Sequence, residues 1–371
     1  MNRRSALLVY LLAVSIALIV IADIFTRVAT AWTLGDWLIN YRGGFVRRGL
    51  MGEAALRVGN SLGISPVAVV AAIGILMYAV IFYCIWSLLR SSSWKWWVVA
   101  MVVSPATIAF PIMTTRSGFH KEILYFAGLG VLLLMLRRGS PVISMSLFLC
   151  FASVVTILSH EPVAAYAPYY FAALLIVCPP IRALKIIIIP IVVSAFALYA
   201  TVQHPGTAET AKAICASLNN PNLCGGAVSY IGLSKVSARI EVIDTARDFH
   251  YYRNYPIMLL LAALPIVGAY VALWSKCRRE VVIIAVTCAV SSILSIQLFL
   301  YGTDWGRWIY IHVFSLFLLL LFVDSRGDHG EEKPLSLPWF LLPYATCWSM
   351  PGYGDNGLFG YISLVARALH R

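Results

Sequence analysis

Long apolar runs recur from one end of the chain to the other, and they constrain the fold more than any other feature. Each run holds roughly 16 to 25 residues, enough for a helix to cross a hydrocarbon layer of ~30 Å. Backbone polar groups inside such a layer must be paired within the segment, which favours helices. Because 61% of the residues are hydrophobic and only 12% are charged, the chain lacks the polar surface that a soluble globule needs.

The runs predict an all-α integral membrane protein. We expect one polytopic domain over residues 1–371, a bundle of about 11 (10–12) transmembrane helices with two longer external loops. A membrane β-barrel would show short alternating segments in place of continuous apolar runs. The predicted spans lie near 6–24, 67–89, 96–113, 123–136, 142–158, 162–178, 186–203, 255–274, 281–300, 308–323 and 335–350.

Basic residues gather in alternate junctions between the runs, and this alternation predicts the orientation. Lys and Arg collect in short cytoplasmic loops, whereas long loops cross the membrane with little regard to charge. The N-terminus is therefore predicted to be cytoplasmic. The first run is predicted to be an anchor, because no small-residue cleavage signature follows it. The basic junctions carry Arg3-Arg4, Arg90 and Lys95, Arg137-Arg138, Arg182 and Lys185, and Lys276, Arg278 and Arg279.

This orientation places the longer loops, about 25–65 and 204–254, on the external side with the turns 114–122, 159–161 and 301–307. The formal net charge is +12, and many basic residues fall in these external segments, against the usual bias. Such an excess suggests a phosphate-bearing partner. Nucleic acid is not expected, because the chain has no recognition fold and no soluble basic domain.

The first external loop is the most informative segment. It carries Arg42, Arg47 and Arg48 between the acids Asp36 and Glu53. One interpretation is an interfacial amphipathic helix whose arginines touch bulk lipid phosphates. The other is a specific phosphate site, because guanidinium groups match phosphate oxygens in bidentate fashion. We favour the second, since external basic residues are not needed for orientation.

The turn before the run at 123–136 holds Arg116, His120, Lys121 and Glu122. Exposed N–H groups and the positive end of the helix dipole make a helix start attractive to an anion. The plainer interpretation is a helix start with snorkelling side chains. Four ionisable groups in seven residues exceed what capping requires, so these residues are site candidates.

Two further turns add candidates. His160 and Glu161 precede a helix start, where a cap needs neither residue type, and either could accept a proton after its pKa is tuned by burial. Asp304 and Arg307 open another helix, and His312 lies on the helix face of Asp304 at a spacing of eight residues. An Asp N-cap and interfacial Trp anchors explain part of this second pattern but not Arg307 or His312.

Cys215 and Cys224 are the two cysteines in an external loop. They are predicted to form a disulfide around an Asn-Pro turn, with two unpaired thiols as the alternative. No resident metal is expected, because no Cys or His pairs have zinc-ligand spacing. The sequence also lacks a Walker loop, a Rossmann fingerprint and a Gly-x-Ser-x-Gly elbow, which argues against ATP-driven transport and serine hydrolysis.

This arrangement resembles bacterial envelope glycan enzymes that use polyprenyl-phosphate-linked sugars. They comprise polytopic GT-C type glycosyltransferases and the O-antigen or exopolysaccharide polymerases. GT-C members place an acidic residue in the first external loop, where this chain has Asp36, with Glu53 as the second choice. The polymerases carry arginines in large periplasmic loops. Matching residues here are Arg42, Arg47, Arg48, Arg239, Arg247 and Arg253.

The resemblance implies a multi-pass protein of the bacterial inner membrane that works at its periplasmic face. It would transfer sugar from a polyprenyl-(pyro)phosphate donor to a glycan or lipid acceptor, with envelope-biosynthesis proteins as candidate partners. No organic cofactor is implied, and the use of a divalent metal stays open. The implied roles are Asp36 as base, Arg47, Arg48 and Arg116 on phosphate, and His160, Glu161, Asp304 and Arg307 completing the pocket.

Two other functions remain in competition. A transporter or flippase for an anionic or lipid-linked substrate would show paired halves, interrupted helices or charges near the bilayer midplane. The candidate charges of this chain gather at one interface, which favours chemistry at the membrane surface. A non-catalytic assembly subunit is the third alternative, and it predicts normal glycan output after alanine changes at Asp36, His160 and Asp304.

Overall fold

The computed structural model describes residues 11–19, 31–92, 95–114, 119–327 and 338–351, and the regular elements in these ranges are all helices. Six of the helices are long and apolar enough to cross a membrane. They agree with the predicted all-α, multi-pass membrane protein. These helices are α4 (Pro66–Leu89), α8 (Val142–Ser159), α10 (Pro180–Gln203), α13 (Tyr251–Trp274), α14 (Arg278–Tyr301) and α15 (Trp305–Ser325).

Two other predicted spans form shorter helices. The run at 123–136 is α7 (Glu122–Arg137), and the run at 162–178 begins as a 3₁₀ turn, η1 (Glu161–Tyr166), before α9 (Pro168–Val177). Residues 11–19 of the first predicted span are helical.

The runs at 96–113 and 335–350 differ from the prediction. The first is broken into α5 (Trp96–Val103) and α6 (Phe110–Met113), and within the described part of the second only α16 (Leu341–Thr346) is helical. Ser104, which precedes a proline, has an extended ψ of 133° and ends α5. A proline ring disfavours the helical conformation of the residue before it, so continuous hydropathy did not give a continuous helix here.

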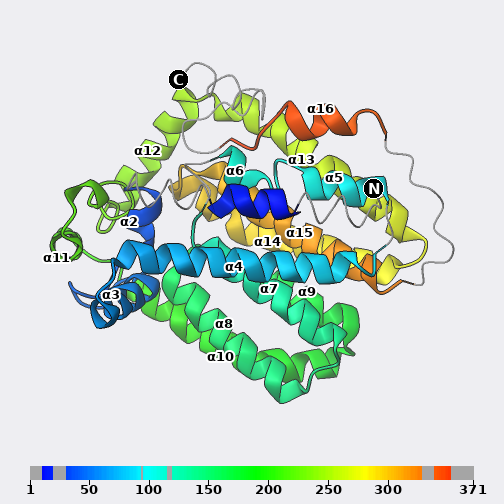
Figure 1. Cartoon of the computed structure of the whole chain (residues 1–371), viewed down its shortest axis with the longest axis horizontal. Helices are drawn as coiled ribbons and strands as arrows, with labels where there is room; N and C mark the ends of the chain where they lie inside the picture. Colours follow the sequence, from blue (N-terminus) through cyan, green and yellow to red (C-terminus); the bar gives the residue numbers. More distant parts are fainter. Residues whose placement is uncertain (1–10, 20–30, 93–94, 115–118, 328–337, 352–371) are drawn as a thin grey trace.

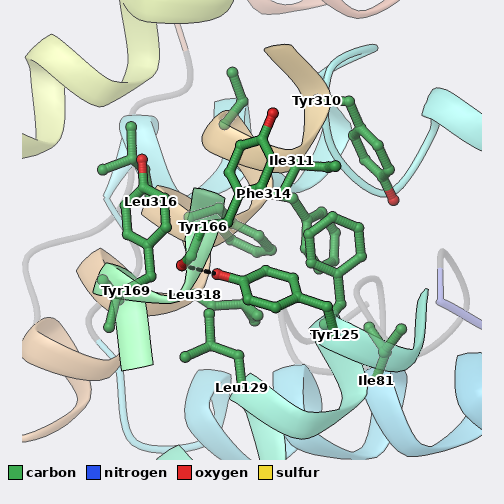
Figure 2. Packing of buried hydrophobic residues seen from close by; sticks show 14 of the residues in the cluster. Ile81, Tyr125, Leu129, Tyr166, Tyr169, Tyr310, Ile311, Phe314, Leu316 and Leu318 are labelled. Carbon is green, nitrogen blue, oxygen red and sulfur yellow. Dashed lines mark hydrogen bonds between the residues drawn. The ribbon is translucent and has the colours of Figure 1, made fainter. Parts of the chain in front are cut away.

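Helix α15 forms the centre of the bundle. Nearly all of its residues are buried, and it packs against α4, α7, α9, α13 and α14. Figure 2 shows part of this core, in which the Tyr125 hydroxyl donates to the backbone oxygen of Tyr166 at 3.1 Å. The outer helices instead expose large apolar side chains, which suits contact with lipid. Examples are Phe151 on α8, Phe196 on α10, Leu260 on α13 and Ile293 on α14.

The two longer loops fold together as a cap at one end of the long helices (Figure 1). Its helical elements are α2 (Thr33–Trp37), α3 (Leu50–Leu62), α11 (Ala208–Leu218), η2 (Pro221–Leu223) and α12 (Lys235–Asp248). Ile39 and Val46 of the first loop share a small core with Ile214, Val228 and Ile231 of the second. This shared core fixes the position of the first loop, which hydropathy alone did not predict.

Hydrogen bonds and a disulfide reinforce the cap. Asn40 donates through Nδ2 to the Ser217 hydroxyl at 3.0 Å. The Arg47 amide donates to the His204 carbonyl at 3.0 Å. Cys215 and Cys224 form the predicted disulfide, with their Cα atoms 5.2 Å apart, and so join α11 to the segment that follows η2. The backbone on either side of the arginine pair is therefore held in place.

Candidate functional site

Charged side chains from three distant parts of the sequence meet beneath the cap. Asp36 on α2 lies 3.8 Å from the Lys121 ammonium, which precedes α7. Arg48 bonds Glu161, the first residue of η1. We call the set Asp36, Arg47, Arg48, Lys121, His160 and Glu161 the charged site. Its residues approach one another because the cap packs on the ends of α7 and α8.

Asp36 is the most unusual member of the charged site. Its carboxylate lies 3.8 Å from Arg48 Nη1, from His120 Nδ1 and from Lys121 Nζ. Both carboxylate oxygens are buried, and neither has a hydrogen-bond partner among the residues that the structure describes. Burial by itself raises the pKa of Asp36, but Lys121, His120 and Arg48 outweigh it and hold the pKa well below the usual range. A buried, ionised carboxylate without hydrogen bonds is costly, which marks a functional position.

Arg48 links the two acids of the charged site. Its Nε lies 3.0 and 3.1 Å from the two carboxylate oxygens of Glu161, and Arg47 Nη1 lies 3.7 Å from the same carboxylate. Burial lowers the pKa of Arg48, but Glu161 and Asp36 more than reverse this and raise it. The guanidinium therefore stays charged between two carboxylates. A ligand phosphate would have to compete with Glu161 for it.

Backbone strain accompanies these contacts. Arg48 and Phe119 both have φ of 66°, a left-handed conformation that costs a non-glycine residue about 1 kcal/mol or more. The Arg48 carbonyl accepts a hydrogen bond from Lys121 Nζ at 3.0 Å, and the Phe119 carbonyl accepts one from Trp37 Nε1 at 2.7 Å. Each strained carbonyl is thus held by a buried side chain from the other segment, which fixes Asp36 against Lys121.

His160 completes the buried part of the charged site. The side chain is fully buried, its ring lies 6.1 Å from the ring of Trp308, and neither ring nitrogen has a hydrogen-bond partner within the described ranges. Burial lowers the pKa of His160 well below its ordinary value, and the positive charges of Arg48 and Arg307 lower it further. The imidazole is therefore neutral near pH 7, and one of its ring nitrogens has a lone pair that can accept a hydrogen bond or a proton.

Arg307 extends the charged site toward α15. Its guanidinium lies 3.6 Å from Asp304 Oδ2 and stacks 4.7 Å above the Trp308 ring. Its charge acts on His160, on Lys121 and on the buried Glu122 at the start of α7. Asp304 and Glu122 therefore belong to the surroundings of the charged site.

Other predicted site residues make their contacts elsewhere. Glu53 bonds Arg57 Nε at 2.7 Å and accepts from the Tyr41 amide, while Arg42 is exposed on the surface. His312 lies between the hydroxyls of Tyr169 (2.8 Å) and Ser295 (3.0 Å), so neither ring nitrogen remains for Asp304. His120, by contrast, contacts Asp36 as described. Arg116 lies outside the described residues.

The first loop also departs from the interfacial helix that was one of its two interpretations. Trp37, Leu38 and Val46 are fully buried in the protein and do not face lipid. Trp37 is a positioning residue that sequence reasoning did not identify, since its indole N–H joins α2 to the segment before α7. A tryptophan directly after an acid in a polar loop was the available signal.

A small apolar cavity of about 80 Å³ lies beside the charged site. It is lined by residues from the N-terminal helix and α4, including Leu18, Ile75, Tyr78 and Phe82, and by Phe119, which directly precedes His120. Its lining is almost wholly apolar and could contact a short stretch of hydrocarbon chain. A larger cavity of about 450 Å³ lies along α12.

Comparison with known proteins identifies no relative. No protein-family model, no curated protein and no solved structure matches the chain. The function is therefore inferred from the geometry of the charged site.

Proposed function

We propose that the protein is a membrane glycosyltransferase or polysaccharide polymerase. It transfers sugar from a polyprenyl-(pyro)phosphate donor to a glycan or lipid acceptor at the periplasmic face of the bacterial inner membrane. The observation that carries this proposal is the buried Asp36 carboxylate, without hydrogen bonds to described residues, beside the cations of Arg48 and Lys121, the His120 ring and a neutral His160. Cations suit a phosphate leaving group, and an unbonded carboxylate suits a base.

The charges assign a role to each group. The acceptor hydroxyl attacks the anomeric carbon, the bond from that carbon to the phosphate oxygen breaks, and its electron pair stays on the phosphate. Arg47, Arg48 and Arg307 stabilise this charge, while Asp36 takes the hydroxyl proton. An arriving phosphate competes for the cations that now surround Asp36. Its carboxylate then becomes more basic at the moment when a base is needed.

The remainder of the donor fits the surroundings of this site. A polyprenyl chain would enter from the bilayer between helices, and the apolar cavity next to Phe119 lies one residue from His120. Carriage across the membrane is the competing function, but it is expected to need ionisable groups deep in the bundle. The charged site instead lies at helix ends, with Lys121 directly before α7 and His160 directly after α8.

The test is a transfer assay with purified protein in nanodiscs. The donor is a polyprenyl diphosphate bearing a labelled sugar, the acceptor is a second lipid-linked sugar, and the products are separated by size. We expect labelled product with wild-type protein and about 10²- to 10⁴-fold slower formation of it with Asp36→Asn. If reconstituted vesicles show only movement of the intact donor between leaflets, the protein is a flippase and the proposal is wrong.

Lys121 predicts how donor binding depends on pH. Burial lowers the pKa of Lys121 from 10.5 to about 8, although Asp36 opposes this shift. Above pH 8 the site loses one positive charge, so the Kd for a polyprenyl phosphate should rise about tenfold per pH unit. Titration of the polyprenyl phosphate, followed by tryptophan fluorescence at several pH values, measures this Kd. Lys121→Met should bind weakly, with a Kd that does not rise with pH in this way.

As pH rises, the contribution of Lys121 to stability increases while donor binding weakens. The two effects can therefore be told apart. Because the pKa of Lys121 is lower in the folded than in the unfolded chain, the unfolded chain binds more protons between about pH 8 and 10.5. The contribution of this group to the free energy of unfolding therefore increases as pH rises through that window. Weaker binding that accompanies a falling melting temperature would indicate unfolding and contradict the assignment.

A further inference from the structure

Helix α12 carries an exposed apolar stripe that the proposed reaction does not use. Val236, Ile240 and Ile243 are 70%, 54% and 42% exposed. At about 100° of helix rotation per residue, the three side chains fall within an arc of about 60°. We call these three residues the α12 stripe. Large apolar side chains that gather on one face, in place of being scattered singly, mark a contact surface.

The rest of the circumference of α12 faces two other environments. Val242, Thr245 and Ala246 are buried in the protein. A third face lies about 110° from the stripe, and its acidic side chains are exposed or partly exposed: Glu241, Asp244 and Asp248. One face of α12 therefore packs on the protein and one suits water, while the stripe is unsuited to water.

The position of α12 indicates what the stripe contacts. The helix packs against α13 and α14, both of which are long and apolar enough to cross a membrane. These two helices expose large apolar side chains of their own, such as Leu260 and Ile293. In Figure 1, α12 runs across the direction of α4 at the end of the bundle that carries the cap. A helix in this position lies near the plane of the membrane surface and borders the lipid-facing surface of its neighbours.

Aromatic side chains mark the same level of the molecule. Tyr252 in the first turn of α13 and Tyr301 at the end of α14 are exposed. Trp305 opens α15, and its ring lies 5.7 Å from the ring of Tyr252. Tyrosine and tryptophan gather where the hydrocarbon of a bilayer meets its headgroups. Because α12 ends just before α13 begins, its stripe approaches this boundary.

Basic side chains complete the pattern. Lys235 and Arg239 are exposed and lie along the edge of α12 between the stripe and the buried face. Arg247 is also exposed and follows Ile243 one turn later. Long basic side chains beside an apolar stripe can reach lipid phosphates while their stems stay on apolar surface. The acids lie on the opposite edge, away from these phosphates.

We propose that α12 lies in the membrane interface at the cap end of the bundle. The stripe enters the acyl chains, and Lys235 and Arg239 contact headgroup phosphates. This placement depends on the membrane-spanning helices and not on the proposed reaction. The Tyr251 hydroxyl donates to the Thr303 carbonyl at 2.9 Å, which joins the start of α13 to the segment before α15. Through this contact α12 sets the depth of the charged site relative to the headgroups.

Spin-label accessibility tests the placement in the full protein. The label is attached to a genetically encoded ketone amino acid, which leaves the native cysteines unchanged, in nanodiscs of phosphatidylethanolamine and phosphatidylglycerol. Oxygen concentrates in hydrocarbon, whereas a nickel chelate stays in water. At positions 236, 240 and 243 we expect oxygen to relax the label more strongly than the nickel chelate does. Ser237 and Asp244 are exposed outside the stripe. They are the matched controls and should show the reverse order.

Three results would overturn the proposal. Stronger relaxation by nickel at the stripe positions places the stripe in water. Dipolar broadening that grows with the number of protein copies per nanodisc shows that a second copy covers it. A stripe label that is shielded from both reagents in native membranes, but open to nickel in nanodiscs, shows that another protein covers it. A lack of glycosyl transfer changes none of these readings, so the two proposals fail separately.

The double variant Ile240→Gln with Ile243→Gln provides a second measurement. Glutamine forms helices at least as well as isoleucine, so the intrinsic helix propensity of α12 is kept. Both isoleucines are exposed in the protein, and the melting temperature should therefore stay near that of wild type. Hydrogen exchange of the α12 amides in nanodiscs should become faster, because the helix loses its apolar contact with lipid. Exchange at the wild-type rate would contradict the proposal.

Discussion

Asp36→Asn is expected to lower the kcat of glycosyl transfer by about 10²- to 10⁴-fold, the range associated with a positioned proton acceptor. Asparagine keeps the shape of the side chain but cannot take the proton. The change also removes the negative charge beside Lys121 and Arg48. Because the pKa of Lys121 is already lowered to about 8, the ammonium can lose its proton, which limits the cost of leaving it buried.

Glu53→Gln is the matched control for this prediction. Glu53 lies in the same loop and was the second candidate for the acid, but its carboxylate bonds Arg57 Nε at 2.7 Å. We expect its kcat to stay near that of wild type. Initial rates at saturating donor compare the kcat of the two variants, and size-exclusion profiles check that both are folded. An active Asp36→Asn protein, or an inactive Glu53→Gln protein of normal size, would exclude Asp36 as the base.

Arg48→Ala is expected to abolish product and also to destabilise the protein. Removing one partner of a buried ion pair costs about 3–5 kcal/mol, and the partial exposure of Arg48, 23% for its side chain, reduces this figure. Among the described residues, the variant leaves the Glu161 carboxylate paired by Arg47 alone, at 3.7 Å. Arg47→Ala should also abolish product, with a smaller loss of stability because that side chain is 31% exposed.

A double variant separates the loss of a phosphate contact from a loss of folding. Arg48→Ala with Glu161→Gln removes both charges of the pair, so the melting temperature should recover most of what Arg48→Ala loses. Product should remain absent, because the phosphate still lacks its guanidinium. Glycan of normal amount and chain length from Arg47→Ala or Arg48→Ala would rule out the phosphate assignment. Recovery of activity in the double variant would show that Arg48 is only structural.

Particular residues show how far sequence reasoning reached. The apolar runs predicted helices such as α4, α8, α13 and α14 with good boundaries, because hydropathy over a membrane-length window is a local property. Cysteine spacing predicted the Cys215–Cys224 disulfide, which the structure contains. Ser104 and the proline that follows it indicated the helix break after Val103. The prediction of one continuous span relied instead on the apolar composition of the run.

For other residues, spacing along one helix did not show which residues they contact in the folded protein. Glu53 and Arg57 stand four residues apart on α3, a spacing that already favours pairing with each other over a shared site. His312 follows Asp304 at helical spacing, but its partners, Tyr169 and Ser295, come from α9 and α14. Spacing along one helix predicts a common face, whereas the neighbouring helices decide what that face contacts.

Composition and the order of apolar and charged segments were enough to determine an all-helical membrane protein with its polar clusters at helix ends. Only the tertiary structure decided that Asp36 is buried beside Lys121, that Arg48 bonds Glu161, and that the two loops share one core. Hydropathy and charge act on each residue where it stands in the chain. Burial and ion pairing instead depend on contacts between segments far apart in the chain, and no short window of sequence contains both partners.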